Sequence, residues 1–473
     1  MEEKMNKKIV LALLAVVIFA MPAFASVQNV KVSGDVDSTW LLRENFDLGA
    51  NIIGDRYQNL FITQTRLRVD ADLTDNVSTS VGLINERPWD EPTTVNTDID
   101  LNVANAKFRE FLYSPLTLVV GRQNDVAYGN HLVFDSNGVN NIAGADSGIS
   151  AVAQDLTKQT ALDGVRAILD YNPLTIDLVY FKVDGNTLTG APDDHDDVDL
   201  YGTNVNYQFG DDWNSVAEAY FFARIDKSTQ DPATPTGDQD DSIYLPGLRA
   251  STNPIKGLNV QGEVAWQRGN KVLTQTAVSK AGFSVEQNQN REAIAAQGII
   301  NYEVQADSVA KYKPVLTGVY TYVSGDQNPN STTNGPTGNK EVWTAWDPFF
   351  ENQGGGTIYN TLFDLTNVHI AVASLSMTPM EDVTTKVTWT GMRLDKKIDD
   401  TSFDLRQPDG GTIDIENSSD LDVGYEIDAE VVYDYTEDVQ IGLNCGWFNP
   451  GDLFRSVNDD MASQAILHAN VNF

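Results

Sequence analysis

The chain ends on the stretch that decides its fold, Ala465-Ile466-Leu467-His468-Ala469-Asn470-Val471-Asn472-Phe473. Every second residue counted back from the terminal phenylalanine is apolar, and the alternate positions are asparagine or histidine, with Ile466 as the exception. Because successive side chains of a strand point to opposite faces, this pattern predicts a strand with one apolar and one polar face. Such a strand fits either the edge of a soluble sandwich or the closing strand of a membrane barrel.

The first residues of the chain favour the barrel. Lys7 and Lys8 precede an apolar run over residues 9–21, and Ala23-Phe24-Ala25 supplies small residues at a cleavage site. This order of charged, apolar and small residues is typical of a secretory signal peptide. The apolar run is too short to span a bilayer as a helix. We therefore expect residues 1–25 to be a signal peptide.

Composition bounds what residues 26–473 can be. No later segment is apolar enough for a transmembrane helix, and only helices and closed barrels satisfy the backbone in lipid. A chain with 67 acids, 32 bases and a net charge of −35 is a poor partner for nucleic acid, and its one cysteine, Cys445, excludes an internal disulfide. The acidic runs at 193–197 and 238–241 are read as solvated loops, with a calcium site as the alternative. We predict no metal centre and no cofactor.

Alternating segments recur along the chain, for example over residues 201–209, 258–266 and 423–435. Eight short, turn-forming connections separate such segments: 74–76, 114–115, 172–173, 210–212, 253–257, 313–314, 378–382 and 436–438. Long polar connections lie between them: 123–160, 227–241, 324–362 and 397–420. Short turns that alternate with long loops are typical of outer-membrane barrels.

The turn count predicts the size of the barrel. With both termini in the periplasm, eight short turns imply an all-β, transmembrane antiparallel β-barrel of about 18 strands over residues 26–473. An error of two strands would arise if 123–160 hides a hairpin. A barrel of this size leaves an aqueous lumen. Long loops without secondary structure of their own are usually functional, so we expect 123–160 or 324–362 to fold into the lumen and narrow it.

Several short blocks, spread through most of the chain, resemble the alginate export-type porin family. The blocks are Gly121-Arg122-Gln123 with Tyr128-Gly129 and, upstream, Arg109; Ser324-Gly325-Asp326-Gln327-Asn328; Trp346-Asp347-Pro348-Phe349-Phe350; Asn367; Gly424-Tyr425-Glu426-Ile427-Asp428; and Phe448-Asn449-Pro450-Gly451-Asp452. The resemblance implies an 18-stranded outer-membrane channel that passes polysaccharide or other large hydrophilic solutes. The excess of acids departs from the basic lumen that a carrier of polyanionic alginate is expected to have.

Charged residues on inward-facing positions are the candidate pore lining. The basic candidates are Arg66, Arg68, Arg109, Arg122 and Arg166, and the acidic ones are Glu426, Asp428 and Glu430. Rings of charged side chains set ion selectivity, so the set that dominates the constriction decides which solutes pass. Since much of the negative charge falls in loops, we expect an anion-tolerant pore.

The predicted function is an outer-membrane channel for diffusion or export of hydrophilic solutes, a polysaccharide among them. Its expected partners are outer-membrane lipid and the solute; the residues leave monomer or trimer open. One alternative is a structural or adhesive surface protein. The other is a barrel enzyme, for which the sequence offers His131 near Asp125, Asp135 and Ser136 but no nucleophile motif. We therefore expect no enzymatic activity.

Overall fold

The computed structural model describes residues 29–50, 57–89, 99–138, 149, 152–184, 197–227, 240–275, 285–327, 342–352, 354–398, 402–455 and 458–473. The expected signal peptide, most of 139–151, residues 193–196 of the first acidic run and residues 238–239 of the second lie outside these ranges. No helix of the described residues is long and apolar enough to cross a membrane.

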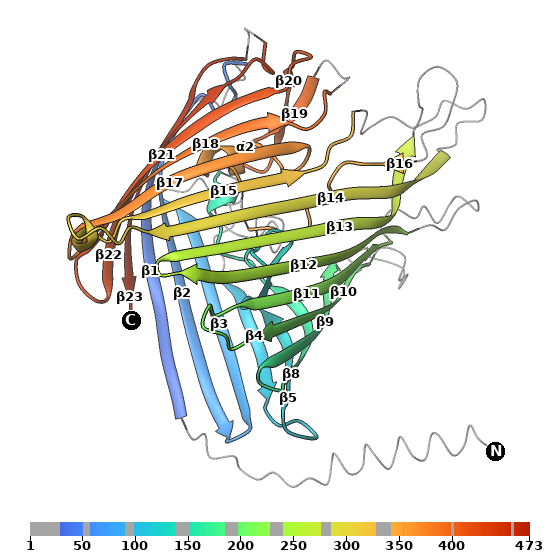
Figure 1. Cartoon of the computed structure of the whole chain (residues 1–473), viewed down its shortest axis with the longest axis vertical. Coiled ribbons are helices and arrows are strands. Elements are labelled where there is room, and N and C mark those ends of the chain that lie inside the picture. Colours follow the sequence, from blue (N-terminus) through green and yellow to red (C-terminus); the bar gives the residue numbers. More distant parts are fainter. Residues whose placement is uncertain are drawn as a thin grey trace.

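Eighteen strands form one closed antiparallel barrel, as the turn count predicts (Figure 1). The first nine are β1 (Asn29–Glu44), β2 (Tyr57–Thr74), β3 (Val77–Pro88), β4 (Asp100–Phe108), β5 (Leu116–Gln123), β8 (Leu162–Asp170), β9 (Leu174–Asp184), β10 (Val198–Gln208) and β11 (Val216–Asp226). The others are β12 (Asp241–Ile255), β13 (Leu258–Gln275), β14 (Val285–Glu303), β15 (Val315–Val323), β17 (Val368–Met380), β18 (Val383–Leu394), β21 (Asp422–Asp434), β22 (Val439–Pro450) and β23 (Ala462–Asn472).

The C-terminal strand closes the barrel, as its alternation suggests. β23 pairs antiparallel with β1 from Asp35↔Asn472 to Glu44↔Ser463, and the N–H of Phe473 donates to the carbonyl oxygen of Gly34 at 2.9 Å. All eight short connections join successive barrel strands at the expected positions. Closure matters because it leaves no strand edge with unpaired N–H and C=O groups facing lipid.

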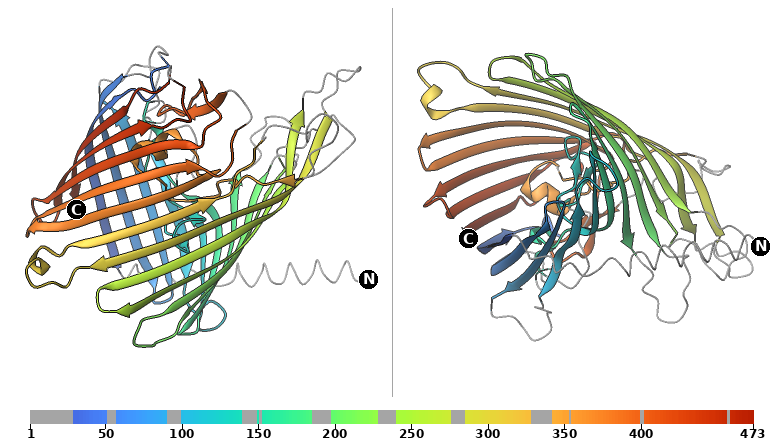
Figure 2. Two further views of the ribbon diagram at one scale, coloured as in Figure 1. Left: turned by 45° about the horizontal axis from the view of Figure 1, so that its top comes forward. Right: turned by 90° about the horizontal axis from the view of Figure 1, so that it is seen from below.

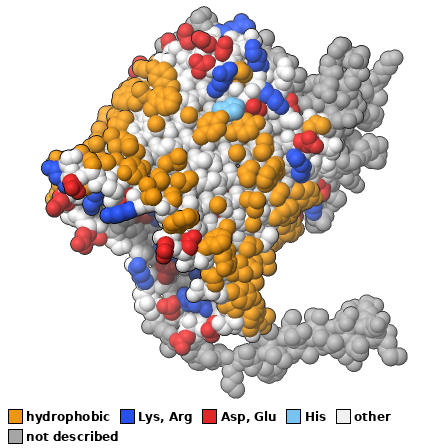
Figure 3. Space-filling view, in the orientation of Figure 1, with side chains coloured by type: hydrophobic (Ala, Val, Ile, Leu, Met, Phe, Trp, Pro, Cys, Tyr) orange, Lys and Arg blue, Asp and Glu red, His pale blue; other side chains and the backbone are white. Residues whose placement is uncertain are grey.

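The outer face of the barrel is apolar. Figure 3 shows hydrophobic side chains spread over the strands, with charged groups mainly towards the ends. On β21, Tyr425, Ile427 and Val431 are exposed on this face, whereas Glu426 and Asp428 point the other way and are buried. The alternation over 423–435 therefore separates a lipid-facing side from a lumen-facing side, as a barrel wall requires.

The lumen is partly filled by segments of the long connections. They contain β6 (Ala127–Tyr128), β7 (Phe134–Asp135), η1 (Gln154–Leu156), β16 (Val342–Trp343) and α2 (Thr357–Leu362), and a separate hairpin of β19 (Ser402–Arg406) and β20 (Thr412–Glu416) follows β18. Figure 2 shows α2 inside the ring of strands. The main hydrophobic core joins these segments to inward-facing wall residues. Connection 123–160 does hide a hairpin, but β6 and β7 lie in the lumen as a separate two-stranded sheet and are not part of the barrel wall.

Candidate functional site in the barrel lumen

Two inner segments from different loops bind each other inside the barrel. We call residues 124–138 with 152–161 the first inner segment, and 342–352 with 354–367 the second. The N–H of Asp135 donates to the Phe350 carbonyl at 2.8 Å, and the N–H of Phe350 donates to the Val133 carbonyl at 3.0 Å. The side chains of Asn352 and His131 both reach the Asp135 carboxylate, at 2.8 and 2.9 Å. The described parts of both loops expected to narrow the lumen therefore lie inside the barrel and bind each other.

Aromatic packing fastens this unit to the wall. Phe134 is fully buried and stacks on Phe222 of β11, with ring centroids 5.0 Å apart. Phe350 meets Phe134 edge-on at 5.6 Å, and Phe349 lies 6.2 Å from Phe222. Burying such rings in a close-packed cluster makes a large favourable contribution to the free energy of folding. This packing therefore fixes the position of the inner segments against the wall strands β9 to β14.

Ion pairs add to the packing at Asp347. Its carboxylate lies 2.9 Å from Arg291, 3.2 Å from Arg224 and 3.8 Å from Lys271, three bases on three wall strands. Burial alone would raise the pKa of Asp347, but the three neighbouring cations outweigh burial and lower the pKa. The carboxylate therefore stays ionised and holds the second inner segment against β11, β13 and β14.

Another wall strand, β21, holds α2 through its acids. The Glu426 carboxylate accepts hydrogen bonds from the N–H groups of Ile358 and Tyr359, at 2.8 Å each. Asp428 accepts one from the Thr357 hydroxyl at 2.8 Å. A carboxylate at the start of a helix satisfies N–H groups that have no partner within the helix. Two of the predicted pore-lining acids are thus engaged with the inner segment.

η1 is held in the same manner by wall residues of β1 and β3. Arg43, which is 1% exposed, forms an ion pair with Asp155. Lys158 lies 2.7 Å from Asp37, and Glu86 accepts hydrogen bonds from the Thr157 hydroxyl at 2.6 Å and the Lys158 N–H at 2.7 Å. The inner segments therefore contact wall strands on several sides of the lumen.

Three of the predicted pore-lining bases, Arg66, Arg68 and Arg166, lie beside acids. Arg66 faces Asp35 across β1 and β2 at 2.8 Å, Arg68 lies 3.0 Å from Asp70, and Arg166 lies 2.5 Å from Asp177. Arg109 follows β4 and is exposed near the short-turn end. Each of the first three is therefore paired with an acid rather than free in the channel.

Arg122 is placed differently from the other bases. It shares the parity of exposed Val120, pairs across the strands with Ala104 and Asp163, and lies 2.5 Å from the half-exposed Asp163 carboxylate. This is the outward parity of β5, so the prediction that Arg122 lines the pore is wrong. The alternation already contained the signal, because Leu118 and Val120 are apolar at the same parity.

Of the predicted acids, Glu430 stands apart. It is half-buried on the lumen side of β21 and pairs by register with Lys386 of β18.

Among the described residues, no cluster of His, Cys, Asp and Glu could hold a metal ion. From the acidic runs, Asp197 pairs with Lys182 and Asp241 with Arg291.

A second feature of the lumen is a cavity of about 310 Å³ near the short-turn end, which we call the basic cavity. It is lined by inward-facing residues of β1 to β5 and β8. The charged ones are Lys31, Arg68, Asp70, Asp72, Lys107, Arg109, Asp125 and Arg166. Bases therefore outnumber acids here, against the acidic total of the chain.

Sequence reasoning missed Lys31 and Lys107 in this cavity, together with Arg43 and Arg291 further along the lumen. Each lies on the inward side of its strand, so alternation could have found them. Their partners could not be found in that way, because Asp155 and Asp347 come from loops distant in the sequence.

Comparisons with known proteins agree with this geometry. The family model described as alginate export matches residues 23–467. A search of the curated proteins finds no match. The solved structures that resemble the chain include a BenF-like porin from Pseudomonas fluorescens Pf-5, with 9% identity, a TM-score of 0.55 and coverage of 94% of this chain and 100% of that one.

Two Pseudomonas aeruginosa structures are similar to the same degree. OpdK with vanillate gives 9% identity, a TM-score of 0.54 and coverage of 94% and 99%. OccK2 (OpdF) in complex with glucuronate gives 11% identity, a TM-score of 0.51 and coverage of 94% and 98%. At such identities the likeness shows the fold. The family match over nearly the whole length shows more: the chain belongs to the alginate export family and is an outer-membrane β-barrel channel.

Proposed function

We propose that the protein passes hydrophilic solutes, a polysaccharide among them, through its lumen, and that the passage tolerates anions. The basic cavity carries this proposal, because its bases face the lumen at the short-turn end, where a solute from the periplasm would enter. We propose Arg66, Arg68, Arg109, Arg166, Glu426, Asp428 and Glu430 as lumen-lining residues, with Lys31 and Lys107 added. The protein is proposed to have no enzymatic activity.

Not all of these bases contribute equally to selectivity. Arg68 and Arg166 each lie beside an acid, so that their fields are largely cancelled beyond a Debye length of ~8 Å at physiological salt. Lys107 and Arg109 form no ion pair with any described residue. Lys31 forms none either, so these three bases, set against Asp72 and Asp125 of the same cavity, leave the net positive charge that supports anion passage.

The test is the reversal potential of single channels in planar bilayers under a salt gradient. Wild type should conduct with a preference for anions, and the double variant K107Q/R109Q should lose that preference or reverse it. R122Q is the matched control, since it removes a base from the outward face and should leave selectivity unchanged. The double variant R66Q/R68Q should have a smaller effect, because both bases are paired.

Two results would count against the proposal. A folded barrel without conductance would remove the channel function. A cation preference that K107Q/R109Q leaves unaltered would remove the basic cavity as the filter. Glucuronate is a suitable anionic solute for this comparison, since a carboxylated sugar combines charge with hydroxyl groups.

Residues 1–25 are proposed to be a signal peptide that is removed on export. Protein recovered from the outer-membrane fraction should then begin at Ser26 in N-terminal sequencing. An intact N-terminus on the membrane-inserted protein would contradict this proposal.

A further inference from the structure

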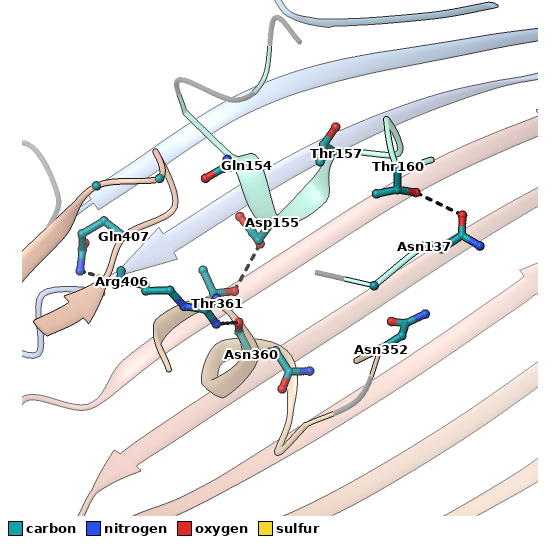
Figure 4. A pocket seen from close by; sticks show the side chains of 13 residues that line it. Asn137, Gln154, Asp155, Thr157, Thr160, Asn352, Asn360, Thr361, Arg406 and Gln407 are labelled. Carbon is teal, nitrogen blue, oxygen red and sulfur yellow. Dashed lines mark hydrogen bonds between the residues drawn. The ribbon is translucent and has the colours of Figure 1, made fainter. Parts of the chain in front are cut away.

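A second pocket lies on the other side of the inner segments, among the long connections (Figure 4). We call it the loop-end pocket. Its volume is about 220 Å³, the space of roughly seven water molecules at ~30 Å³ each. It is lined by Asn137, Gly138, Gln154, Asp155, Thr157, Thr160, Asn352, Asn360, Thr361, Arg406, Gln407, Gly410 and Gly411. Amides, hydroxyls and glycines dominate this list, and no aromatic or aliphatic side chain belongs to it.

The two charged groups in the loop-end pocket are already neutralised. Asp155 forms an ion pair with Arg43 of the wall. Arg406 lies 3.0 Å from Asp364 and donates to the backbone carbonyls of Asn360, at 2.7 Å, and Phe363. A charged ligand would therefore meet no free countercharge here, in contrast to the basic cavity at the opposite end.

Several amide groups of the pocket have hydrogen-bonding capacity left. The Gln407 side chain is 5% exposed, and its Oε1 atom has no hydrogen-bond partner. Among the described residues, none hydrogen-bonds the side-chain amide of Gln154 or the Nδ2 group of Asn360, whose Oδ1 accepts from Gly355. A buried acceptor without a partner costs about 1–3 kcal/mol, so a ligand that satisfies it gains affinity.

The pocket thus offers neutral donors and neutral acceptors side by side. A hydroxyl group is a donor and an acceptor at once, so a ring with several hydroxyls matches such a lining. Figure 4 shows these side chains arriving from both inner segments and from the β19–β20 hairpin around one space. The glycines at 138, 410 and 411 leave that space open.

We propose that the loop-end pocket binds one uncharged, hydroxyl-rich sugar unit. The inference rests on the proposed channel function in one respect, since the pocket would be a binding site on the path of the solute. It narrows the substrate class to a saccharide that carries neutral units, and separates it from a polymer with a carboxylate on every unit.

Binding is tested on the folded barrel in a zwitterionic detergent that contains no sugar, by calorimetric titration with trehalose, glucose and glucuronate. The neutral sugars should bind and glucuronate should bind more weakly. Gln154→Leu keeps the volume of the side chain but removes its hydrogen bonds, and should weaken trehalose binding roughly three- to tenfold. Gln154→Asn should restore part of the affinity. Gln208→Ala, an exposed amide at the end of β10, is the control and should bind as wild type does.

The outcomes separate this inference from the channel function. No binding of neutral sugars, binding that Gln154→Leu leaves unchanged, or tighter binding of glucuronate would each overturn the sugar site. Conductance measured on the same preparations reports the channel independently, because the site can fail in a conducting barrel. Trehalose binding to a barrel without conductance would keep the sugar site and remove the path through it.

Discussion

At the scale of single residues, acids tie the inner segments together. Asp135 accepts hydrogen bonds from His131, Asn352 and the N–H of Asn137, at 2.9, 2.8 and 2.8 Å. Burial acts to raise the pKa of Asp135, but these hydrogen bonds outweigh burial and lower the pKa to about 2. The hydrogen bond to Asp135 in turn raises the pKa of His131, against the smaller opposing effect of burial. Each ionised group of the pair therefore stabilises the ionised form of the other.

This pair predicts a pH dependence for the first inner segment. Because the folded pKa of His131 is raised, its stabilising contribution is complete below its ordinary pKa of about 6.5 and is lost as pH rises through the raised value. Asp135 contributes above its ordinary pKa of about 3.9, and its contribution is lost as pH falls towards 2. His131 is half-exposed, so its contribution is expected to be no more than about 1 kcal/mol.

Amide hydrogen exchange over residues 131–137 checks the alkaline limb. After correction for intrinsic exchange, protection in wild type should decline as the pH rises above the ordinary histidine pKa of about 6.5. His131→Asn should abolish the decline, and asparagine tolerates the left-handed φ of 62° at this position. The same decline in the variant would show that another group is responsible.

At the scale of elements, α2 depends on a wall strand for its position. It is one short helix of six residues, and a helix of that length is not stable on its own. Glu426 of β21 supplies the acceptors for its first N–H groups, and Ile358, Tyr359 and Leu362 are buried against the core. The contact couples the second inner segment to the C-terminal part of the barrel.

Glu426→Ala should therefore release α2. Two buried N–H groups would lose their acceptor, at a cost of about 1–3 kcal/mol for each. We expect faster hydrogen exchange at Ile358 and Tyr359 and larger open-channel current noise. Glu430→Ala is the matched control, since Glu430 lies on the same face of β21 without contacting the helix in any described interaction. Equal effects of the two variants would contradict the capping role.

At the scale of the whole molecule, the barrel wall and the inner segments that fill its lumen are held by different forces. The wall is one ladder of backbone hydrogen bonds closed by β1 and β23. The inner segments depend on side chains: an aromatic cluster around Phe134 and ion pairs around Asp347. A change in the inner segments can therefore alter the conductance of the channel while the wall stays intact.

Phe134→Ala should distinguish the role of the inner segments from that of the barrel wall. Removing a buried aromatic ring costs about 3–5 kcal/mol, which would loosen the inner segments and raise the conductance. Heat-modifiable gel migration, which reports the closed wall, should stay as in wild type. Phe61→Ala removes an exposed ring from the outer face and should change neither the conductance nor the pore noise. An unchanged conductance in Phe134→Ala would mean that the inner segments do not limit the current.

The sequence by itself determined the wall. Alternation is a local property with a period of two, and turn residues mark where a strand ends, so the polar and apolar faces, the eight short turns and the eighteen strands follow from neighbouring residues. The inward position assigned to Arg122 is the exception, because the apolar residues Leu118 and Val120 at the same parity mark that side of β5 as the outer face. The family blocks likewise anticipated the channel class.

Only the tertiary structure decided what the lumen contains. Asp155 meets Arg43, and Asp347 meets Arg224 and Arg291, across more than fifty residues of chain in each case. No local pattern selects such partners. Closure of the wall places inward-facing residues from distant parts of the sequence around one lumen, and the path of each loop decides which of them it contacts. For the same reason the acidic total of the chain did not reveal where bases prevail: local charge depends on which side chains share a cavity, and that is fixed by closure of the barrel.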